Sequence, residues 1–317
     1  MIKYLFIFLF SIFSFGQNSL DEIEKFILEK DYNKSEDYLV EILINDSYNS
    51  EALELLGDVY SYQDKWDYAI TQFEILVERD NLNATYQYKL GEALGRKALQ
   101  INTVSALFLL DDVKEAFIKT LELDKNHIDA HWALVVYYTE LPGILGGSIK
   151  KALKYSEELK TISLVDYYLS KGYVYEYDDE YELAEENYLK AVEVGGSLTC
   201  FQKLSDLYET EGEYQKAINT IEKANNKLQI NSLNYQLGKV SAAYNLELEK
   251  GEKCLIKYIN NYKQDDGITL EWPYYRLAQI YRLKNDKASA LKWIEKSLKF
   301  KPEFESAQEE KELILKM

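Results

Sequence analysis

The apolar residues of this chain recur at intervals of three and four over most of its length. From Leu53 the pattern reads Leu-x-x-Leu-Gly-x-x-Tyr, and from Ala69 it reads Ala-x-x-x-Phe-x-x-Leu. Such spacing places apolar side chains on one face of an α-helix. Turn-forming residues such as Glu211-Gly212 separate the periodic segments. The pattern therefore predicts short amphipathic helices joined by tight turns.

The same frame returns along the chain. Leu90-Gly91 lies 34 residues beyond Leu56-Gly57, and small residues recur at the eighth and twentieth positions of the frame. Small residues are needed where two antiparallel helices cross closely. One such hairpin cannot bury its own apolar face, so neighbouring hairpins must stack. Later copies are marked by Tyr168, Gly172, Tyr175, Ala184, Tyr188 and Ala191, then Phe201, Ser205, Tyr208, Ala217 and Ala224, then Leu237 and Gly238, and finally Tyr274, Ala278, Tyr281, Ala290, Ile294 and Pro302.

This frame resembles the tetratricopeptide repeat family over nearly the whole chain after residue 16. The resemblance implies an all-α fold, a right-handed superhelical solenoid of about eight helical hairpins over residues 17–302. Two copies, at about 18–49 and from about Ile128, are inferred from the period, since Ile23 and Val135 stand where the family has a small residue. Residues 303–317 are expected to form a C-terminal capping helix, because terminal repeats need a polar outer face.

The first sixteen residues predict a secretory signal peptide. Lys3 precedes a short apolar run from Tyr4 to Phe15, and Ser14 and Gly16 offer a small-x-small cleavage site. The run is too short to span a bilayer comfortably, and an uncleaved anchor is the alternative. We therefore expect an exported protein, periplasmic or extracellular, with no integral membrane span after cleavage.

The formal net charge of −17 argues against two classes of partner. Nucleic acids and anionic lipids both need lysines and arginines that replace their counterions, so we expect neither to bind. Solubility accounts for most of the acidity. The two cysteines, Cys200 and Cys254, exclude a disulfide scaffold. Two buried free thiols are favoured over a bridge between them, although spacing alone does not decide this.

Residues 141–148, LPGILGGS, raise the question of a phosphate-binding loop. A P-loop needs a Gly-Lys pair followed by a hydroxyl residue, after a strand. No Gly-Lys pair occurs here, and the predicted neighbours are helices at about 128–140 and 149–161. We therefore interpret the stretch as a turn in which Pro142 ends the first helix and Ser148 caps the second. A weak anion-binding nest at the second helix is the alternative.

Two insertions interrupt the frame, near residues 100–112 and 141–149. Both fall between the two helices of adjacent repeats, so they should emerge on one rim, where residues 107–110, among them Leu107 and Phe108, could pack against Ile144 and Leu145. Insertions on one face of a solenoid often mark a binding or oligomer surface. The alternative to a binding or oligomer surface is an apolar plug, in which the two insertions pack only on each other and stabilise the rim. The sequence does not decide between them.

Candidate chemistry is sparse. His127 and His131 are the only histidines and stand four residues apart, which would suit a metal if one helix held both. However, His127 falls at a repeat boundary and His131 at a packing position. Acidic pairs such as Asp111-Asp112 are better explained as solvated helix faces and turns than as acid–base catalysts. We therefore expect no metal, no cofactor and no catalytic residue.

In the resembled family the first helix of each repeat lines a concave groove. Large rings with few rotatable bonds anchor a partner well, and carboxylates favour a basic one. The resemblance implies a non-catalytic scaffold or adaptor that binds a protein or peptide in an acidic, aromatic groove, although some rings are expected to pack against the next repeat. A small-molecule or glycan-binding accessory of an envelope transport system is the alternative. The family register assigns to the groove Tyr62, Tyr88, Arg96, Trp132, Tyr173, Tyr177, Asp206, Tyr235, Trp272, Tyr275 and Arg282.

Overall fold

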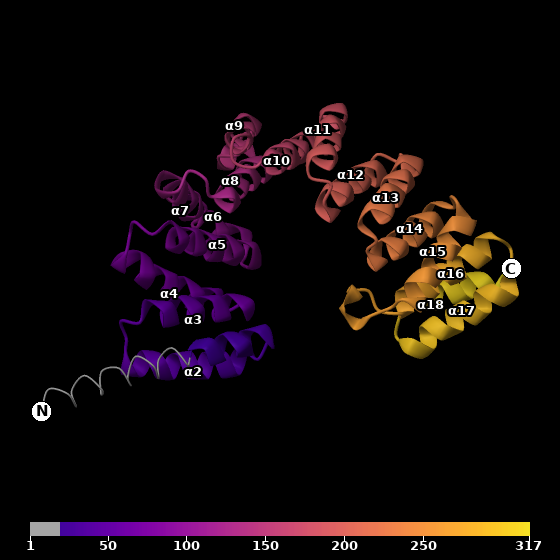
Figure 1. Cartoon of the computed structure of the whole chain (residues 1–317), viewed down its shortest axis with the longest axis horizontal. Helices are drawn as coiled ribbons and strands as arrows, with labels where there is room; N and C mark the ends of the chain where they lie inside the picture. Colours follow the sequence, from indigo (N-terminus) through magenta and orange to yellow (C-terminus); the bar gives the residue numbers. More distant parts are fainter. Residues whose placement is uncertain (1–19) are drawn as a thin grey trace, which may run out of the picture. The chain divides into compact units, whose positions relative to one another are not determined.

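The computed structural model describes residues 20–317, which are all-α. The predicted signal peptide, residues 1–16, lies outside the described residues. The chain divides into two compact units, one ending at Ile162 and one running from Ser163 to Met317. In each unit, helices that follow one another along the chain pack together as hairpins (Figure 1).

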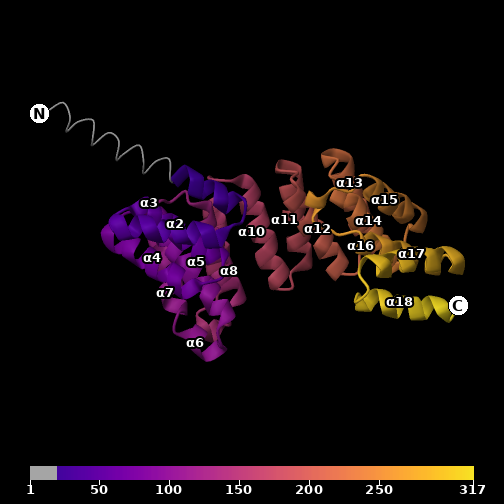
Figure 2. The same cartoon turned by 90° about the horizontal axis from the view of Figure 1, so that it is seen from below.

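The first unit begins with a helix over residues 20–28 that precedes α2 (Tyr32–Asn45). Three hairpins follow: α3 (Ser50–Tyr62) with α4 (Trp66–Arg79), α5 (Ala84–Gln100) with α7 (Leu110–Leu123), and α8 (Ile128–Glu140) with α9 (Ile149–Leu159). The short α6 (Thr103–Leu107) joins α5 to α7 and lies at the edge of this unit (Figure 2). The 3-10 turn η1 (Gly143–Leu145) joins α8 to α9.

The second unit contains four hairpins and a final helix. The hairpins are α10 (Leu164–Tyr177) with α11 (Tyr181–Val194), α12 (Leu198–Thr210) with α13 (Tyr214–Leu228), α14 (Asn231–Tyr244) with α15 (Leu248–Asn260), and α16 (Glu271–Leu283) with α17 (Lys287–Phe300). The 3-10 turn η2 (Gln264–Asp266) joins α15 to α16. The last helix, α18 (Glu305–Leu315), packs on α16 and α17.

Polar residues at the turns start many of these helices. The side chains of Asn49, Asn83, Ser163 and Ser197 each accept a hydrogen bond from a backbone N–H in the first turn of α3, α5, α10 and α12. These N–H groups have no partner within the helix, so each cap stabilises the start of a helix by about 1 kcal/mol. The short turns and their caps thus set where each hairpin begins.

Glycine stands where paired helices cross. Gly172 of α10 faces the ring of Tyr188 on α11, and Gly238 of α14 faces Leu255 on α15, so closely that an added Cβ would overlap these side chains. Tyr188 and Leu255 are fully buried. The Tyr188 hydroxyl donates to Glu176 at 2.6 Å, and burial followed by this carboxylate raises the pKa of Tyr188. The small eighth position of the frame is therefore a requirement of close packing.

The glycine-rich loop is a turn between helices, as predicted. The Ser148 hydroxyl accepts a hydrogen bond from the Lys151 backbone N–H and so caps α9. Gly146 has a φ of 99°, a conformation that favours glycine. Gly147 approaches the Leu141 carbonyl so closely that a side chain has no room there. These contacts account for the loop's composition without a phosphate.

An apolar plug between the two insertions, which the sequence left open as one alternative, would bury Phe108 and Ile144, and the structure does not bury them. Phe108 is 80% exposed, Ile144 is 94% exposed and Leu107 is 40% exposed, while Leu145 is half-buried. Neither α6 nor η1 contains a buried residue. Each segment is only a few residues long and has no second layer of structure to cover it. Their apolar side chains therefore add to the surface of the first unit rather than to its core.

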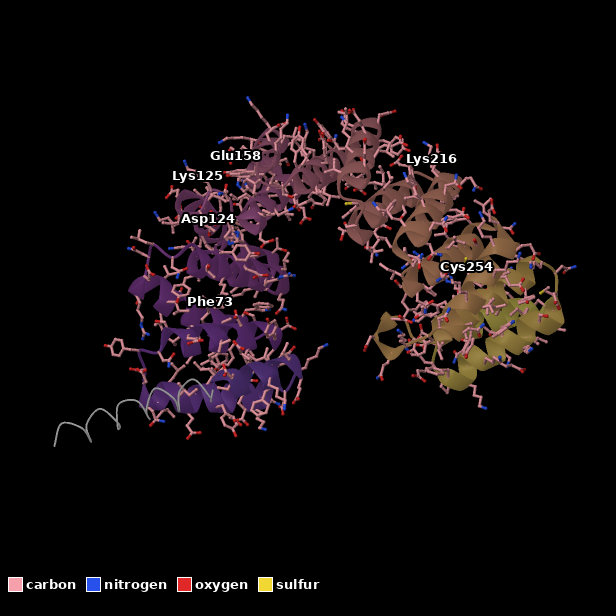
Figure 3. The ribbon with its side chains drawn as sticks, in the orientation of Figure 1. Phe73, Asp124, Lys125, Glu158, Lys216 and Cys254 are labelled. Carbon is pink, nitrogen blue, oxygen red and sulfur yellow. The ribbon has the colours of Figure 1, made fainter. Side chains whose placement is uncertain are left out.

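The two cysteines are free thiols in the second unit. Cys200 is fully buried on α12, and Cys254 is half-buried on α15 (Figure 3). Burial raises the pKa of Cys254.

Candidate functional site

An apolar cleft of about 450 Å³ lies in the first unit between α5 and α8. Its floor is α7, whose Leu110, Val113 and Phe117 follow one another at helical spacing and so share one face. The α5 wall consists of Tyr88, Glu92, Gly95, Arg96, Ala98 and Leu99. The opposite wall consists of Asp129, Trp132, Ala133, Val136, Tyr137, Glu140 and Leu141, on α8 and its C-terminal cap.

Small residues on the two walls leave this space open. A Cβ added at Gly95 would meet only the Val113 side chain, at an ordinary contact distance of 3.7 Å. Ala98 and Ala133 also place no more than a methyl group on the walls. Val113 and Phe117 close the bottom and are buried. The cleft is thus a hollow over an intact core, not a gap in it.

Tyr88 is held in place by aromatic neighbours. Its ring centroid lies 4.6 Å from that of His127 and 5.8 Å from that of Phe117. His127 is itself fixed, because it is the N-cap of α8 and its Nδ1 accepts a hydrogen bond from the Ala130 N–H at 3.3 Å. The sequence interpretation of His127 as a repeat boundary is confirmed. The ring of Tyr88 is therefore presented to the cleft in a defined position.

The charges around the cleft are mainly negative. Glu92, Asp129 and Glu140 line it, against the single guanidinium of Arg96. Burial first, and then Glu92 and Asp129, raise the pKa of Tyr88 to about 12, although Arg96 opposes the shift. Its hydroxyl is therefore a neutral hydrogen-bond donor at physiological pH. An apolar floor beneath an acidic edge suits a ligand that is apolar on one side and positively charged on the other.

A second cleft, of about 580 Å³, lies between α3 and α5 and shares Tyr88 and Arg96 with the first. Tyr62 lines it and is 56% exposed. Lys89 pairs with Glu54 at 2.7 Å and with Asp58 at 2.6 Å across this cleft. Burial raises the pKa of Asp58, although Lys89 opposes the shift. The structure thus brings Tyr62, Tyr88, Arg96 and Trp132 to two neighbouring clefts on the first unit.

Three predicted groove residues of the second unit keep exposed or partly exposed positions. Tyr177 is 52% exposed, and the Lys203 ammonium lies 5.7 Å from the ring centroid of Tyr173. Asp206 lines a cleft of about 340 Å³ with Lys203 and Lys239. Burial raises the pKa of Asp206, although both lysines oppose the shift. This surface carries charges of both signs and few rings.

The other four predicted groove residues are used inside the second unit. Tyr235 and Tyr275 are only 6% and 9% exposed. The Trp272 ring packs against Phe304 at 4.6 Å between centroids. The Arg282 guanidinium pairs with Glu310 of α18. The segment around α18 thus contacts Trp272, Tyr275 and Arg282 through Phe304 and Glu310. Tyr235 packs instead against Tyr258 of α15.

The two histidines do not converge on one site. His131 is 2% exposed, its Nε2 lies 3.0 Å from the Lys125 carbonyl oxygen, and its Nδ1 lies 3.7 Å from a Glu158 oxygen. His127 serves as a helix cap. Within residues 20–317, no group of three or more histidine, cysteine, aspartate and glutamate side chains is arranged to hold a metal ion.

Comparisons with known proteins identify the type of repeat and its fold. A sequence model of the tetratricopeptide repeat matches residues 165–194, 198–226 and 273–304, which are the hairpins α10–α11, α12–α13 and α16–α17. These three hairpins are tetratricopeptide repeats. A solved tetratricopeptide repeat protein from Parabacteroides merdae has the same fold, with a TM-score of 0.52 at 13% identity over 94% of this chain and 98% of that chain.

Two further tetratricopeptide repeat structures are similar over smaller shares of the chain. YrrB, described as having an unusual peptide-binding site, has a TM-score of 0.45 at 19% identity over 63% of this chain and 99% of its own. TTC0263 of Thermus thermophilus has a TM-score of 0.42 at 15% identity over 71% of this chain and 97% of its own. No curated protein matches the sequence. No helix within residues 20–317 combines the length and apolar character that crossing a bilayer requires.

The tetratricopeptide frame located Tyr88 and Trp132 on the cleft but missed Leu99, Val136 and Tyr137. The helix α5 has 17 residues where α3 and α8 have 13, and this added turn carries Leu99 onto the wall. Val136 and Tyr137 follow Trp132 at helical spacing. Extending the apolar face along α8, rather than stopping at the repeat register, would have found both.

Proposed function

We propose that this protein is a non-catalytic binding scaffold whose cleft between α5 and α8 holds a segment of a partner protein. Tetratricopeptide repeats commonly mediate protein binding, which supports recognition rather than turnover. The composition of the cleft carries the proposal. It combines an apolar floor with the rings of Tyr88, Trp132 and Tyr137, and with three carboxylates against one guanidinium.

Binding would draw its free energy from apolar burial, at about 25 cal/mol per Å² removed from water. The helices and the contacts around Tyr88 already fix the receiving surface, so little of this gain is lost in ordering it. The carboxylates at the edge would select a basic segment and speed its approach. A partner with acidic residues at these positions would be repelled.

The test is affinity capture from an envelope extract, with the bound proteins quantified by mass spectrometry. Trp132→Ala removes an anchor ring, and Ala133→Phe fills the hollow without removing any contact. We expect a partner held by the wild type to be lost from both variants. Tyr48→Ala is the matched control, because Tyr48 is 81% exposed and does not line the cleft. Equal capture by all four proteins, each with a native circular dichroism spectrum, would sink the proposal.

The size of the cleft favours a second candidate, a small apolar ligand or glycan. Its volume of about 450 Å³ falls within the usual range for small-molecule sites. Salt separates the two candidates. A basic protein segment should bind more weakly as ionic strength rises, because its attraction to Glu92, Asp129 and Glu140 is screened. Binding of a neutral ligand should hardly change.

We also propose that the protein is exported. The charge of Lys3, the apolar run after it and the small residues at 14 and 16 support this. N-terminal sequencing of the mature protein from the envelope or the medium should begin at Gln17. A chain that still begins at Met1 and stays in the cytoplasm would refute export.

A further inference from the structure

The first insertion is uncharged over residues 101–110, before its closing acidic pair Asp111-Asp112, and the second is uncharged throughout. Residues 101–110 and 141–149 lack aspartate, glutamate, lysine, arginine and histidine, in a chain that is 29% Asp, Glu, Lys and Arg. Their apolar side chains are nevertheless exposed, with Val104 at 67%, Phe108 at 80% and Ile144 at 94%. We call Val104, Leu107, Phe108 and Ile144 the rim patch. Exposed apolar side chains without neighbouring charges are typical of the centre of an interface.

The rim patch continues the cleft. Leu110 ends the uncharged part of the first insertion and Leu141 begins the second, and both line the cleft together with Leu99. Leu99 is itself 79% exposed and stands just before the first insertion. Both insertions therefore leave the cleft at the same end, where α5 and α8 finish. An occupant of the cleft that extended past this end would meet the rim patch next.

The cleft is shaped for an elongated occupant. It follows α5 from Tyr88 to Leu99 and α8 from Asp129 to Leu141, a run of about 17 Å at the rise of an α-helix. An extended peptide in this space would leave backbone N–H and C=O groups against leucine, valine and phenylalanine side chains, where they find no partner. A helix satisfies its own backbone groups and presents an apolar stripe to the groove.

We propose that the partner segment is a basic amphipathic helix, whose apolar face fills the cleft between α5 and α8 and continues over the rim patch. The proposal rests on the function proposed above and names its partner. The lysines or arginines flanking the apolar face would lie against Glu92, Asp129 and Glu140. The absence of charge over residues 101–110 and 141–149 fits the apolar face of such a helix, since a charged side chain there would be desolvated without a partner.

The test uses the full chain and a fluorescent synthetic peptide of about 18 residues, long enough to pass the end of the cleft. The peptide carries leucines at helical spacing and lysines beside them. A second peptide has the same composition with leucine and lysine alternating. We expect the helical peptide to bind at least about tenfold more tightly than the alternating one. Phe108→Ser with Ile144→Ser should weaken the helical peptide by about tenfold.

Ile44→Ser with Leu82→Ser is the matched control, because Ile44 and Leu82 are 78% and 72% exposed but belong to neither insertion and do not line the cleft. It should change binding less than about twofold.

The outcomes separate the two proposals. If Ala133→Phe abolishes binding while the rim variant binds like the wild type, the cleft is a site but its occupant does not reach the rim patch. The present inference then fails and the proposed function stands. If neither variant weakens the peptide, both proposals fail. Rim-dependent binding to phosphatidylcholine vesicles, with no peptide binding, would show the rim patch to be a lipid contact and overturn the inference.

Discussion

The ring of Phe73 on α4, the residue labelled in Figure 3, lies over Gly57 on α3. A Cβ added at Gly57 would stand 2.5 Å from the ring carbon Cε1. Phe73 is 2% exposed and is enclosed on its other sides. The two helices of this hairpin are therefore as close as a glycine allows. The same relationship joins Gly172 to Tyr188 in the second unit.

Gly57→Ala should destabilise the first unit by about 1–3 kcal/mol, because the buried ring must move or the helices must separate. Thermal unfolding followed by circular dichroism measures this as a lower midpoint. Gly95→Ala is the control, since its new methyl group would meet only Val113 at 3.7 Å. Helix propensity predicts a gain there of about 0.5–1 kcal/mol. An unchanged midpoint for Gly57→Ala would contradict the close crossing.

The pair between Arg282 and Glu310 ties α18 to α16, and the Glu310 side chain is only 4% exposed. Arg282→Met should cost the second unit about 3 kcal/mol, because it leaves a buried carboxylate without its partner. Replacing both residues, by Arg282→Met with Glu310→Leu, should recover most of the loss. Urea unfolding of the two variants provides the measurement.

Lys190→Met is the comparison for that pair, since Lys190 and its partner Glu186 are both exposed on α11. It should leave the urea midpoint unchanged, because water screens such a pair. If Arg282→Met also left the urea midpoint unchanged, the packing of α18 would not depend on the contact between Arg282 and Glu310.

The stability of the second unit should fall in acid through Glu252. Burial raises the pKa of Glu252, but hydrogen bonds from Lys284 and from the Tyr281 hydroxyl, at 2.6 Å, outweigh burial and hold the pKa below its ordinary value of 4.5. The folded state thus binds this proton less readily than the unfolded chain. Its contribution is complete above pH 4.5 and is lost as the pH falls through the lowered pKa.

Unfolding midpoints of the wild type and Glu252→Gln between pH 6 and pH 3 test this. The advantage of the wild type should shrink as the pH falls. A constant difference across the series would show that Glu252 does not titrate with the lowered pKa.

The sign is opposite for Asp58 in the first unit. Burial raises its pKa above 3.8, even though Lys89 opposes the shift. The folded state therefore holds this proton more tightly than the unfolded chain, and the stability it adds is lost as the pH rises from 3.8 through the raised pKa. Asp58→Asn should reduce the pH dependence of the free energy of unfolding of the first unit in this pH range. A profile for Asp58→Asn that keeps the wild-type slope would contradict the assignment.

The turn at 141–148 should tolerate a methyl group at one glycine and not at another. Gly147→Ala would place Cβ against the Leu141 carbonyl, so the loop must shift and carry Leu141 away from the cleft wall. We expect a loss of about 1–3 kcal/mol and weaker partner binding. Gly143→Ala meets nothing within 4 Å and should behave like the wild type. Calorimetric melting and peptide titration of both variants provide the comparison.

Local sequence was enough to predict the repeating hairpins, because spacing at three and four residues and a small residue at most crossings are consequences of helix geometry. It also predicted where α8 ends and α9 begins, the cap at Ser148 and the position of His127 at a helix start. Capping and turn formation depend on residues close in sequence, so local patterns reveal them. The same local rules identified the glycine loop as a turn between two helices.

Which aromatic rings line a cleft and which pack against other side chains depends on the tertiary structure. The repeat register treats Trp132 and Trp272 alike, but Trp132 lines a cleft while Trp272 packs against Phe304. No residue close to Trp272 in the sequence predicts that contact, because Phe304 comes near Trp272 only when the chain folds back before α18. The extra turn of α5 likewise places Leu99 on a wall that no local pattern describes. Hydrophobic periodicity is a property of single helices, whereas an open cleft depends on what the neighbouring helices leave uncovered.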